Sequence, residues 1–307
     1  MKPSLLVISH LNRRPIIDSL FAELSVTFST TIEKIAHRII DDFDLIIEEF
    51  NINDYDLVLV DIPHKYLRRH VKTLLRYQQK IVTYEEDLCQ NYMPDSPWHR
   101  EFTDFYKQFD GISIIGTGSA VVRRYEKEGG TANFLPKGFD SNIIGQQNVS
   151  RDIDLGFIGA LSSNVYVSRY NTLRYIDRHS ELQCFRTSPG KEYNDSLNRI
   201  NTFFSADIGI GEYMSKNFEA MAAGCLLIAY RQGDGEEDAL GFEDGKNILL
   251  YSDRQQALEK IKWAGDNPEQ AKAIARAGTE HVNAHFSFDV LSKKMSTILL
   301  KCLGHSL

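Results

Sequence analysis

Short apolar runs alternate with longer amphipathic stretches along this chain of 307 residues, and the alternation restarts near the middle. A run such as 55–61, YDLVLVD, is typical of a buried strand, whereas apolar residues repeated every three or four positions are typical of a helix. Strand and helix in regular alternation form right-handed crossovers, which give a parallel sheet with helices on both faces. The pattern therefore predicts an α/β fold made of two successive Rossmann-like halves.

The same pattern places the expected elements in each half. In the first half the strands are 5–9, 55–61, 80–83, 111–115 and 131–135, and the helices are 15–24, 66–79 and 119–128. In the second half the strands are 154–157, 182–186, 207–210, 225–230 and 247–251, and the helices are 168–179, 194–204, 216–223, 254–264, 268–285 and 290–302. The polar stretch 138–152 is predicted to be a linker. We therefore expect an N-terminal domain at 1–145, a C-terminal domain at 146–289 and a tail helix at 290–307.

The composition is that of an ordinary globular protein, with 42% hydrophobic and 25% charged residues. These values exclude a disordered chain, a collagen-like repeat and a long coiled coil. No stretch reaches the ~20 apolar residues that span a bilayer, and the apolar run 5–8 is too short for a signal peptide, so a cytoplasmic protein is expected. The four cysteines are far apart without a CxxC pair, which argues against structural zinc and a disulfide framework. The net charge of -7 argues against a general polyanion binder, although it leaves room for a small basic pocket for phosphate.

The most informative segment is 216–230, KNFEAMAAGCLLIAY, a predicted helix that runs into a strand. Phe218, Met221 and Ala222 share one face of the helix, and Gly224 stands where a helix end takes a left-handed residue. Glu219 is the exceptional residue, because it places a carboxylate in a helix whose small side chains favour close packing. It is either a solvated glutamate favoured by the helix dipole or a carboxylate that holds the hydroxyls of a ribose.

This segment resembles the nucleotide-binding segment of the GT-B glycosyltransferases, in particular the C-terminal domain of the glycosyl transferases group 1 type that CgeB-like proteins share. The resemblance covers about 154–288 and includes GFIGAL (156–161), KNFEAMAAG (216–224), FEDGKNILLYSD (242–253) and NPEQAKAIARAGTEHVNAHFSF (267–288). It implies two Rossmann-like domains that face a cleft, with the acceptor on the N-terminal domain and the donor on the C-terminal domain. It also implies that the tail helix, from about Val290, crosses back to the N-terminal domain.

The resemblance implies donor-binding roles for residues of the second half. Glu219 is expected to hold the ribose hydroxyls of a nucleotide-diphosphate sugar. The diphosphate is expected at the N-terminus of the same helix, where backbone N–H groups and the helix dipole favour anions. The expected donor-binding residues are Gly159, Ala160, Ser162, Arg169, Lys216, Asn217, Phe218, Glu219 and Gly224. Arg169 has an alternative interpretation as an exposed charge of its helix.

One departure from the family pattern concerns catalysis. Many retaining relatives carry two glutamates eight residues apart, the second of which corresponds to Glu219. The position eight residues earlier is Gly211, and Glu212 lies one residue out of register. The sequence therefore leaves open whether transfer retains or inverts the configuration of the sugar, and whether Glu212 substitutes for the first glutamate.

Candidates for a general base follow predicted strands of the first half. An inverting transfer needs a group that takes the proton of the acceptor hydroxyl. Glu85, Glu86 and Asp87 follow one such strand, at a place where CgeB-like relatives often carry an acidic pair, and His10 follows the first strand. The alternative is that these residues are helix caps and exposed turn residues. The aromatic stretch 92–109 is either an acceptor groove or an amphipathic core helix.

Several catalytic motifs are missing from the sequence. It has no GxxxxGK[ST] phosphate loop, no HExxH and no GxSxG. We also find no DxD pair of the kind that holds a divalent metal under a nucleotide diphosphate. Metal-independent transfer is therefore expected, with no cofactor besides the donor substrate. Lys216, Arg169 and helix dipoles are expected to meet the phosphate charge.

These observations predict a GT-B glycosyltransferase of the hexosyltransferase type, which moves a sugar to a hydroxyl of a saccharide or lipid-linked acceptor. Bacterial surface polysaccharide or glycoconjugate synthesis is the expected setting. Three alternatives remain: a nucleotide-sugar 2-epimerase, a non-catalytic nucleotide-sugar-binding subunit and a DNA-base glycosyltransferase. The negative charge counts against nucleic acid as a partner. The basic stripe 65–80, KYLRRHVKTLLRYQQK, is either a solvated helix face or a contact for acidic lipids at the inner face of the membrane.

Overall fold

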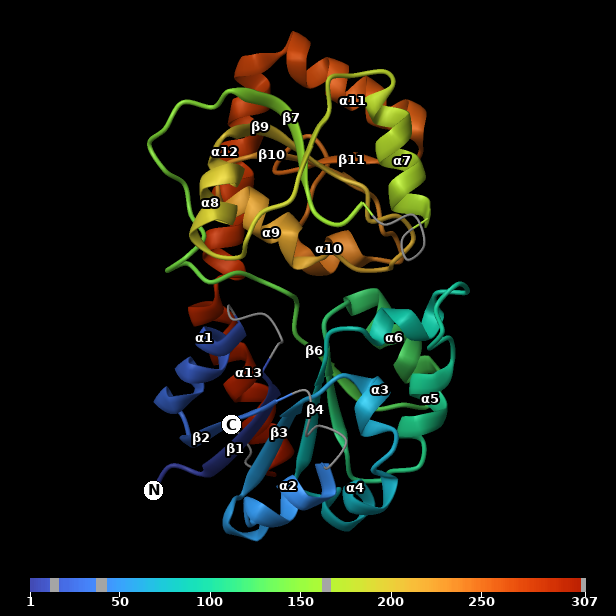
Figure 1. Ribbon diagram of the computed structural model, residues 1–307, viewed down its shortest axis with the longest axis vertical. Coiled ribbons are helices and arrows are strands. Elements are labelled where there is room, and N and C mark those ends of the chain that lie inside the picture. Colours follow the sequence, from blue (N-terminus) through green and yellow to red (C-terminus); the bar gives the residue numbers. More distant parts are fainter. Residues whose placement is uncertain (12–16, 37–42, 162–166, 305–307) are drawn as a thin grey trace. The chain divides into compact units, whose positions relative to one another are not determined.

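The computed structural model describes residues 1–11, 17–36, 43–161 and 167–304 (Figure 1). The chain divides into two compact units: unit 1 comprises Met1–Pro136 with Phe288–Leu307, and unit 2 comprises Lys137–Ser287. Each unit contains one sheet of parallel strands with helices packed against it (Figure 1). The α/β class predicted from the alternation of strands and helices is confirmed.

The strands of unit 1 pair in the order β2-β1-β3-β4-β5-β6, and all neighbours are parallel. They are β1 (Ser4–His10), β2 (Ser29–Ile35), β3 (Leu57–Asp61), β4 (Ile81–Glu85), β5 (Ser113–Gly116) and β6 (Ala132–Phe134). The order reverses at β1, which lies between β2 and β3. Every residue of β3 is buried, because helices cover both faces of a parallel sheet.

The helices of unit 1 depart from the prediction at 66–79 and at α2 (Phe43–Glu49), which the prediction lacks. They are α1 (Ile17–Ala22), α2 (Phe43–Glu49), α3 (His64–Leu67), α4 (Val71–Tyr77), α5 (Glu101–Tyr106), α6 (Ser119–Lys127) and α13 (Phe288–Cys302), with the 3₁₀ turns η1 (Glu23–Val26), η3 (Ile52–Asp54) and η4 (Leu88–Tyr92). The single helix predicted over 66–79 is wrong, because His70 leaves the helical conformation with φ -112° and ψ 33°. Strand β2 is also absent from the prediction. The strand forms an edge of the sheet, and its sequence STTIEKI is mostly polar, so it lacks the apolar run typical of a buried strand.

The aromatic stretch 92–109 contributes α5 to the core of unit 1. Phe102, Phe105, Tyr106 and Phe109 are all buried. The ring of Phe105 meets Tyr106 edge to face at 4.9 Å between centroids and Phe109 at 5.1 Å. The interpretation as an amphipathic core helix is therefore confirmed.

Helix α13 belongs to unit 1, although the whole of unit 2 precedes it in the sequence. It packs on α1 and η1 through an apolar face that includes Leu291, Met295 and Leu299, all buried. Burial of each such side chain stabilises the fold by roughly 1.5–3 kcal/mol. The expectation that the tail helix crosses back to the N-terminal domain is confirmed.

The strands of unit 2 pair in the order β11-β10-β9-β7-β8, again all parallel. They are β7 (Ile153–Ile158), β8 (Gln183–Phe185), β9 (Ile200–Ser205), β10 (Leu226–Tyr230) and β11 (Leu249–Tyr251). The order reverses at β7, between β8 and β9. Counted from the first strand of each unit, both sheets follow the doubly wound order 2-1-3-4-5, and unit 1 adds a sixth strand.

Two predicted elements of unit 2 are wrong. Its helices are α7 (Val167–Asp177), α8 (Lys191–Asn198), α9 (Ser215–Ala222), α10 (Glu236–Leu240), α11 (Arg254–Asp266) and α12 (Pro268–His285). The helix predicted over 194–204 ends at Asn198, and the chain then forms β9 in place of the strand predicted at 207–210. Ile200, Phe203 and Phe204 have a spacing that suits a helix as well as a strand, so only their burial in the sheet decides between the two.

The segment 138–152, predicted as a linker, is fastened to unit 2. The backbone N–H of Gly145 donates to Asn194 Oδ1 at 3.1 Å, and that of Gln147 donates to Asn198 Oδ1 at 2.7 Å. Both asparagines lie on α8 or at its end. These contacts hold the segment against the second unit.

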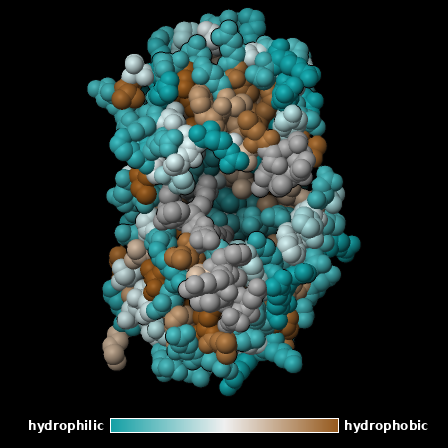
Figure 2. All heavy atoms as spheres, viewed as in Figure 1, coloured by the Kyte–Doolittle hydropathy of each residue, from teal (hydrophilic) through white to brown (hydrophobic). Residues whose placement is uncertain are grey.

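The face of the molecule in Figure 2 is largely hydrophilic, with apolar side chains scattered over it. Large apolar side chains that are exposed include Leu11, Val26, Leu45, Leu75, Val149, Leu161 and Val167. Exposed apolar residues of this scattered kind are normal for a globular protein. Among the described residues, no helix has both the length and the apolar character needed to cross a membrane.

Candidate functional site

The reversal of strand order in unit 2 marks one edge of the sheet as a ligand site. In doubly wound sheets, ligands bind outside the carboxyl ends of the strands at the point where the order reverses. Here that point lies between β7 and β9, which pair directly. β7 ends at Ile158 and β9 ends at Ser205. The residues that follow these strands, Gly159 and Asp207 among them, therefore stand at the reversal.

A cluster of two cations and one carboxylate occupies this edge. Arg169 donates from Nε to Asp207 Oδ1 at 2.9 Å and also from Nη2 to the same oxygen. Lys216 Nζ lies 3.7 Å from that oxygen. Arg169 and Asp207 are buried, whereas Lys216 keeps 15% of its side chain exposed. The interpretation of Arg169 as an exposed helix charge is therefore wrong, and the cluster carries one net positive charge.

Gly159 brings the first loop of unit 2 close to Lys216. A Cβ atom at this position would lie 2.9 Å from the ring of Phe157 and 3.4 Å from Lys216 Nζ. The Lys216 ammonium also lies 5.1 Å from the centre of the Phe157 ring, a distance at which a cation is attracted to the face of an aromatic ring. Ala160 follows and is partly exposed, whereas Ser162 lies outside the described residues.

Asn217 and Phe218 shape the first turn of α9. The backbone N–H of Asn217 donates to the carbonyl of Met214 at 2.9 Å, so it is already used within the turn. The side chain of Phe218 is buried, with its ring 4.9 Å from that of Phe286 and 5.8 Å from that of Phe242. Both residues therefore fasten the helix that carries Lys216 and Glu219.

Gly224 ends α9 in the left-handed conformation, with φ 87°. Its N–H donates to the carbonyl of Met221 and the N–H of Cys225 donates to the carbonyl of Ala220, both at 3.0 Å. This pair of hydrogen bonds defines a Schellman C-cap. Gly224 thus acts through the geometry of the helix end, as its place in the sequence predicts.

Glu219 is buried in the middle of α9, with 2% of its surface exposed. Its Oε2 accepts a hydrogen bond of 2.9 Å from the hydroxyl of Tyr193 on α8. A buried carboxylate is costly unless hydrogen-bond donors compensate it, so the interpretation of Glu219 as a solvated residue is wrong. Glu219 lies three positions after Lys216, and the two therefore share one helix face.

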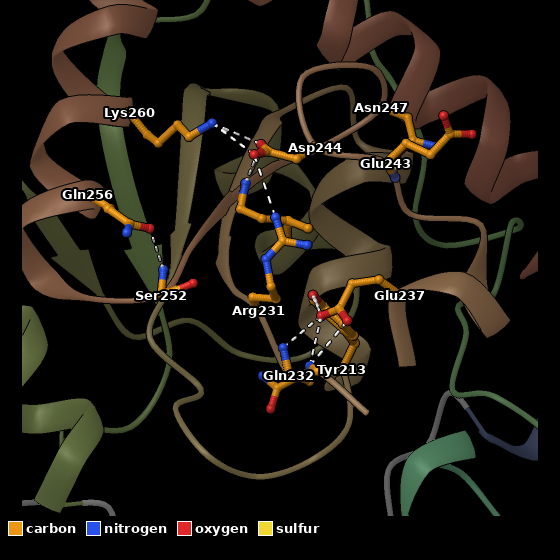
Figure 3. Close-up of polar contacts among 12 residues, drawn as sticks. Tyr213, Arg231, Gln232, Glu237, Glu243, Asp244, Asn247, Ser252, Gln256 and Lys260 are labelled. Carbon is orange, nitrogen blue, oxygen red and sulfur yellow. Dashed lines mark hydrogen bonds and ion pairs between the residues drawn. The ribbon is translucent and has the colours of Figure 1, made fainter. Parts of the chain in front are cut away.

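Gln232, after β10, holds the loop that follows β9. Its side-chain nitrogen donates to the carbonyl of Asp207 at 2.7 Å, and its side-chain oxygen accepts from the N–H of Gly211 at 2.9 Å. Glu237 in turn accepts from the backbone N–H of Gln232 at 2.6 Å and from the Tyr213 hydroxyl at 2.7 Å (Figure 3). Burial, together with the Glu237 carboxylate, raises the pKa of Tyr213 well above its ordinary value. The loop that carries Asp207 is thus fixed by neutral and anionic hydrogen-bond partners.

Glu212 forms a buried ion pair. Its Oε2 lies 2.7 Å from Lys137 Nζ, and both side chains are almost fully buried. The glutamate that is one residue out of register with the family pattern is therefore held by a cation at the start of unit 2.

In unit 1 the strand order reverses between β1 and β3, and polar residues lie at that point as well. Ser9 Oγ donates to Asp61 Oδ2 at 2.7 Å, and both residues are buried. His10 is the last residue of β1, and its ring stacks on that of Tyr66 at 5.9 Å. His10 and Asp61 therefore occupy the place in unit 1 that Gly159 and Asp207 occupy in unit 2.

Glu85 is the last residue of the neighbouring strand β4, Glu86 and Asp87 follow it, and the three differ in exposure. The Glu85 carboxylate is buried and accepts from the hydroxyl of Tyr106 at 3.4 Å. Burial and the nearby Glu85 raise the pKa of Tyr106 well above its ordinary value. Glu86 and Asp87 are partly exposed, so these two keep access to a ligand. Among the described residues, no group of three or more His, Cys, Asp or Glu side chains is arranged to hold a metal ion.

Residues of these sites that are missing from the prediction made on the sequence include Asp207, Tyr193, Gln232 and Lys137. Asp207 directly follows the buried run TFFSA, and an acidic residue after a buried strand is the kind of signal that identifies it. Tyr193, Gln232 and Lys137 reach their partners from other loops and helices. No spacing in the sequence relates them to those partners.

Comparison with protein families gives one match over part of the chain. Residues 158–295 match the family described as glycosyl transferase-like. The match begins at the end of β7 and contains the cluster of Arg169, Asp207 and Lys216, together with Glu219. No curated protein sequence matches this chain.

Solved structures resemble the chain over nearly its whole length. Anabaena HepE (Alr3699) in complex with UDP-glucose has a TM-score of 0.72 at 12% identity, and the match covers 97% of this chain and 100% of that one. A glycosyltransferase from Rickettsia africae has a TM-score of 0.65 at 13% identity, with 99% and 100% covered. UDP-GlcNAc 2-epimerase from Neisseria meningitidis, bound to UDP-GlcNAc, has a TM-score of 0.58 at 13% identity, with 97% and 100% covered. The chain thus has the two-domain GT-B-like fold that the resemblance implies, and its residues 158–295 are similar to the glycosyl transferase-like family.

Proposed function

We propose that this protein is a glycosyltransferase that takes a hexosyl group from a UDP-sugar and transfers it to a hydroxyl of a saccharide or lipid-linked acceptor. The observation that carries the proposal is the gathering of Arg169, Lys216 and Glu219 near the strand reversal of a glycosyl transferase-like domain. The uridine class of donor is supported by HepE, which was solved with UDP-glucose. The proposed setting is bacterial surface polysaccharide or glycoconjugate synthesis on the cytoplasmic side of the membrane.

The donor is proposed to lie along α9. The Glu219 carboxylate accepts hydrogen bonds from the two ribose hydroxyls, and the Tyr193 hydroxyl fixes the orientation of that carboxylate. Arg169 and Lys216 face the diphosphate. As the bond between the sugar and the diphosphate breaks, negative charge grows on the leaving phosphate oxygens, and fixed cations close to them lower the barrier. In this proposal the two side chains supply the positive charge, and transfer is metal-independent.

The acceptor hydroxyl must lose its proton as the new bond forms, and unit 1 is proposed to supply the base. His10 is our first candidate, because it stands at the strand reversal of unit 1 and imidazole is the group most often used for this task. Glu86 and Asp87, partly exposed after β4, are the alternatives. Glu85 is buried against Tyr106, which suits a supporting role.

The ribose assignment has a direct test. Replacement Glu219→Ala is expected to weaken the binding of UDP by about tenfold or more, equivalent to about 1.4 kcal/mol, because two ribose hydroxyls lose their acceptor. Isothermal titration calorimetry with UDP measures the change. Glu269→Ala, at a side chain 82% exposed on α12, removes an equal charge and should leave the affinity unchanged. Wild-type affinity in Glu219→Ala would sink the ribose assignment.

A nucleotide-sugar 2-epimerase is the second candidate, because the Neisseria 2-epimerase has the same overall fold. Incubation with UDP-N-acetylglucosamine alone separates the two activities. An epimerase inverts the configuration at C2 of the sugar without an acceptor, whereas a transferase releases UDP in step with added acceptor. Analysis of the nucleotide sugars by chromatography reports both outcomes.

A further inference from the structure

A groove between α7 and α11 gathers three arginines. It forms a cavity of about 300 Å³ on unit 2, lined by Tyr170, Asn171, Arg174, Tyr175, Arg178 and Arg254. None of these lining residues is acidic. The whole chain, in contrast, carries 42 acidic residues against 35 lysines and arginines, so a groove of this composition is unusual on its surface.

The spacing of the lining residues explains why they converge. Asn171, Arg174, Tyr175 and Arg178 lie at positions i, i+3, i+4 and i+7, so they share one side of α7 and of the turn that follows it. The opposite side of the helix is buried in the core of unit 2. Arg254 is the first residue of α11, which packs beside α7 (Figure 1). Guanidinium groups from two separate elements therefore meet in one groove.

Aromatic rings support two of the three guanidinium groups. Arg254 lies over the ring of Tyr175 at 5.7 Å, and Arg174 lies over that of Tyr170 at 6.0 Å. In the part of the chain that the structure describes, the arginines that form ion pairs with carboxylates do not include Arg174, Arg178 or Arg254. Three like charges around one cavity repel each other, and a bound anion would offset this repulsion.

The chemistry of the groove favours a phosphate ester. Guanidinium groups form paired, charge-assisted hydrogen bonds with phosphate oxygens. A second cavity of about 510 Å³ adjoins the first and shares Arg254. Ile208, Tyr230 and Tyr251 line part of it and offer apolar and aromatic surface to the organic part of a ligand. Asp253 lines it as well, and its carboxylate caps the N-terminus of α11 by accepting from the backbone N–H of Gln256.

We propose that the α7/α11 groove binds a phosphate ester, with the phosphate held by Arg174, Arg178 and Arg254 and the organic group in the adjoining cavity. Neither Arg169 nor Lys216 lines the two cavities, and the second cavity borders their cluster through Ser168 and Ile208, the chain neighbours of Arg169 and Asp207. The proposal is independent of the transferase activity, because it rests only on the composition and shape of the groove. The phosphate ester is either a soluble one or the headgroup of a lipid.

The test compares the wild-type protein with the triple variant Arg174→Gln, Arg178→Gln, Arg254→Gln. The soluble probe is glucose 1-phosphate, titrated by calorimetry without UDP and again in the presence of saturating UDP, which fills a donor site. The lipid probe is co-sedimentation with phosphatidylglycerol vesicles, compared with phosphatidylcholine vesicles. We expect the triple variant to lose binding by at least about tenfold for the probe that binds wild type.

A matched control removes three cations elsewhere on unit 2: Lys246→Gln, Lys272→Gln, Arg276→Gln. These residues are exposed and face glutamates on their own helices or turns, so the control changes the net charge equally and leaves the groove intact. It should bind the probe as wild type does.

Each outcome of this comparison decides the proposal. Binding of glucose 1-phosphate alone, lost in the triple variant, assigns the groove to a soluble phosphate ester. Binding of the phosphatidylglycerol vesicles alone, lost in the same way, assigns it to a lipid headgroup. The proposal is overturned if neither probe binds, if the triple variant binds as wild type, or if the control loses as much as the triple variant. It is also overturned if UDP abolishes the binding of glucose 1-phosphate, which would locate that probe at the donor site.

Discussion

The ion pair of Lys137 and Glu212 joins the first residue of unit 2 to the loop after β9, at 2.7 Å and almost fully buried. Removing two charges from water costs several kcal/mol for each ion, and the attraction between them offsets that cost only when the geometry is good. The pair therefore has more effect on where the loop lies than on net stability. The pair fixes Glu212, which lies one residue out of register with the first glutamate of the family pattern.

Removing one partner of this ion pair is predicted to destabilise the protein strongly. Lys137→Met removes the ammonium group and leaves the Glu212 carboxylate in a buried site, which should lower the free energy of unfolding by about 3–5 kcal/mol. The double variant Lys137→Met, Glu212→Leu should recover most of this loss, because no buried charge remains. Urea denaturation of the three proteins measures the difference. A single variant as stable as wild type would show that the pair is not buried in solution.

His64 stands in an aromatic environment in unit 1. Its ring stacks on that of Phe102 at 4.2 Å and meets Phe105 edge to face at 5.0 Å. Burial, and secondarily the nearby Arg68, lower the pKa of His64 from 6.5 to about 4. The folded protein therefore holds this imidazole neutral at pH values where the unfolded chain protonates it.

This difference predicts a loss of stability in acid. Because the pKa in the folded state is the lower one, the unfolded chain binds the proton first as the pH falls through 6.5. Stability is complete above that pH and declines until about pH 4, by at most about 3 kcal/mol. His64→Phe should flatten this part of the profile, measured by urea denaturation at a series of pH values. An identical slope in wild type and variant would contradict the assignment.

At the scale of elements, the two sheets share one strand order. In both sheets this order determines where the candidate residues lie. Gly159 and Asp207 stand at the reversal in unit 2, and His10 and Asp61 stand at the reversal in unit 1. The carboxyl ends of two neighbouring strands meet there while the connecting helices leave on opposite faces, so the backbone leaves room for a ligand. The positions of these residues are thus a property of the topology.

The left-handed conformation of Gly224 at the end of α9 is predicted to contribute to stability. Gly224→Ala should destabilise the protein by about 2 kcal/mol, because a side chain costs about 1–2 kcal/mol in the left-handed conformation and the new Cβ would lie 2.8 Å from Arg151 Nη2. Gly265→Ala is the matched control. It lies in α11 with no atom within 4 Å of the new Cβ, so it should stabilise by about 0.5–1 kcal/mol. Thermal unfolding distinguishes the two, and equal shifts of Tm would contradict the role of Gly224.

At the scale of the whole molecule, unit 1 is built from two separate parts of the chain, because α13 returns to it after unit 2. The buried face of α13 packs on α1 and η1. The stability of the N-terminal unit therefore depends on α13 (Phe288–Cys302).

Leu299→Ala should reveal this dependence. Loss of a fully buried leucine costs about 2–5 kcal/mol, and Leu299 is 0% exposed. Hydrogen exchange monitored by mass spectrometry should become faster in peptides of unit 1 and stay unchanged in peptides of unit 2. Lys293→Ala, at an exposed position of the same helix, serves as the control. Faster exchange throughout unit 2 would show that the two units unfold together.

Much of the fold follows from the sequence, because apolar spacing and burial are linked directly. The strands β1, β3, β4, β7 and β10 and the helices α6, α7, α9, α11 and α12 all lie close to their predicted positions. One error, at β9, arises because the spacing suits both a helix and a strand, and another, at β2, because a strand at the edge of a sheet is polar. A third arises at 66–79, where His70 leaves the helical conformation.

The pattern of the sequence by itself determined the α/β class and singled out Glu219. The resemblance of the sequence to a known family implied the tail helix that returns to unit 1 and the interest of Lys216 and Arg169. The tertiary structure decided which groups surround them: Tyr193 at Glu219, Asp207 between Arg169 and Lys216, and Lys137 at Glu212. It alone also brought Arg254 to the arginines of α7. The physical reason is that spacing along a chain specifies which side chains share a face of one element. Contacts between elements depend on strand order and on loops, which no local pattern encodes.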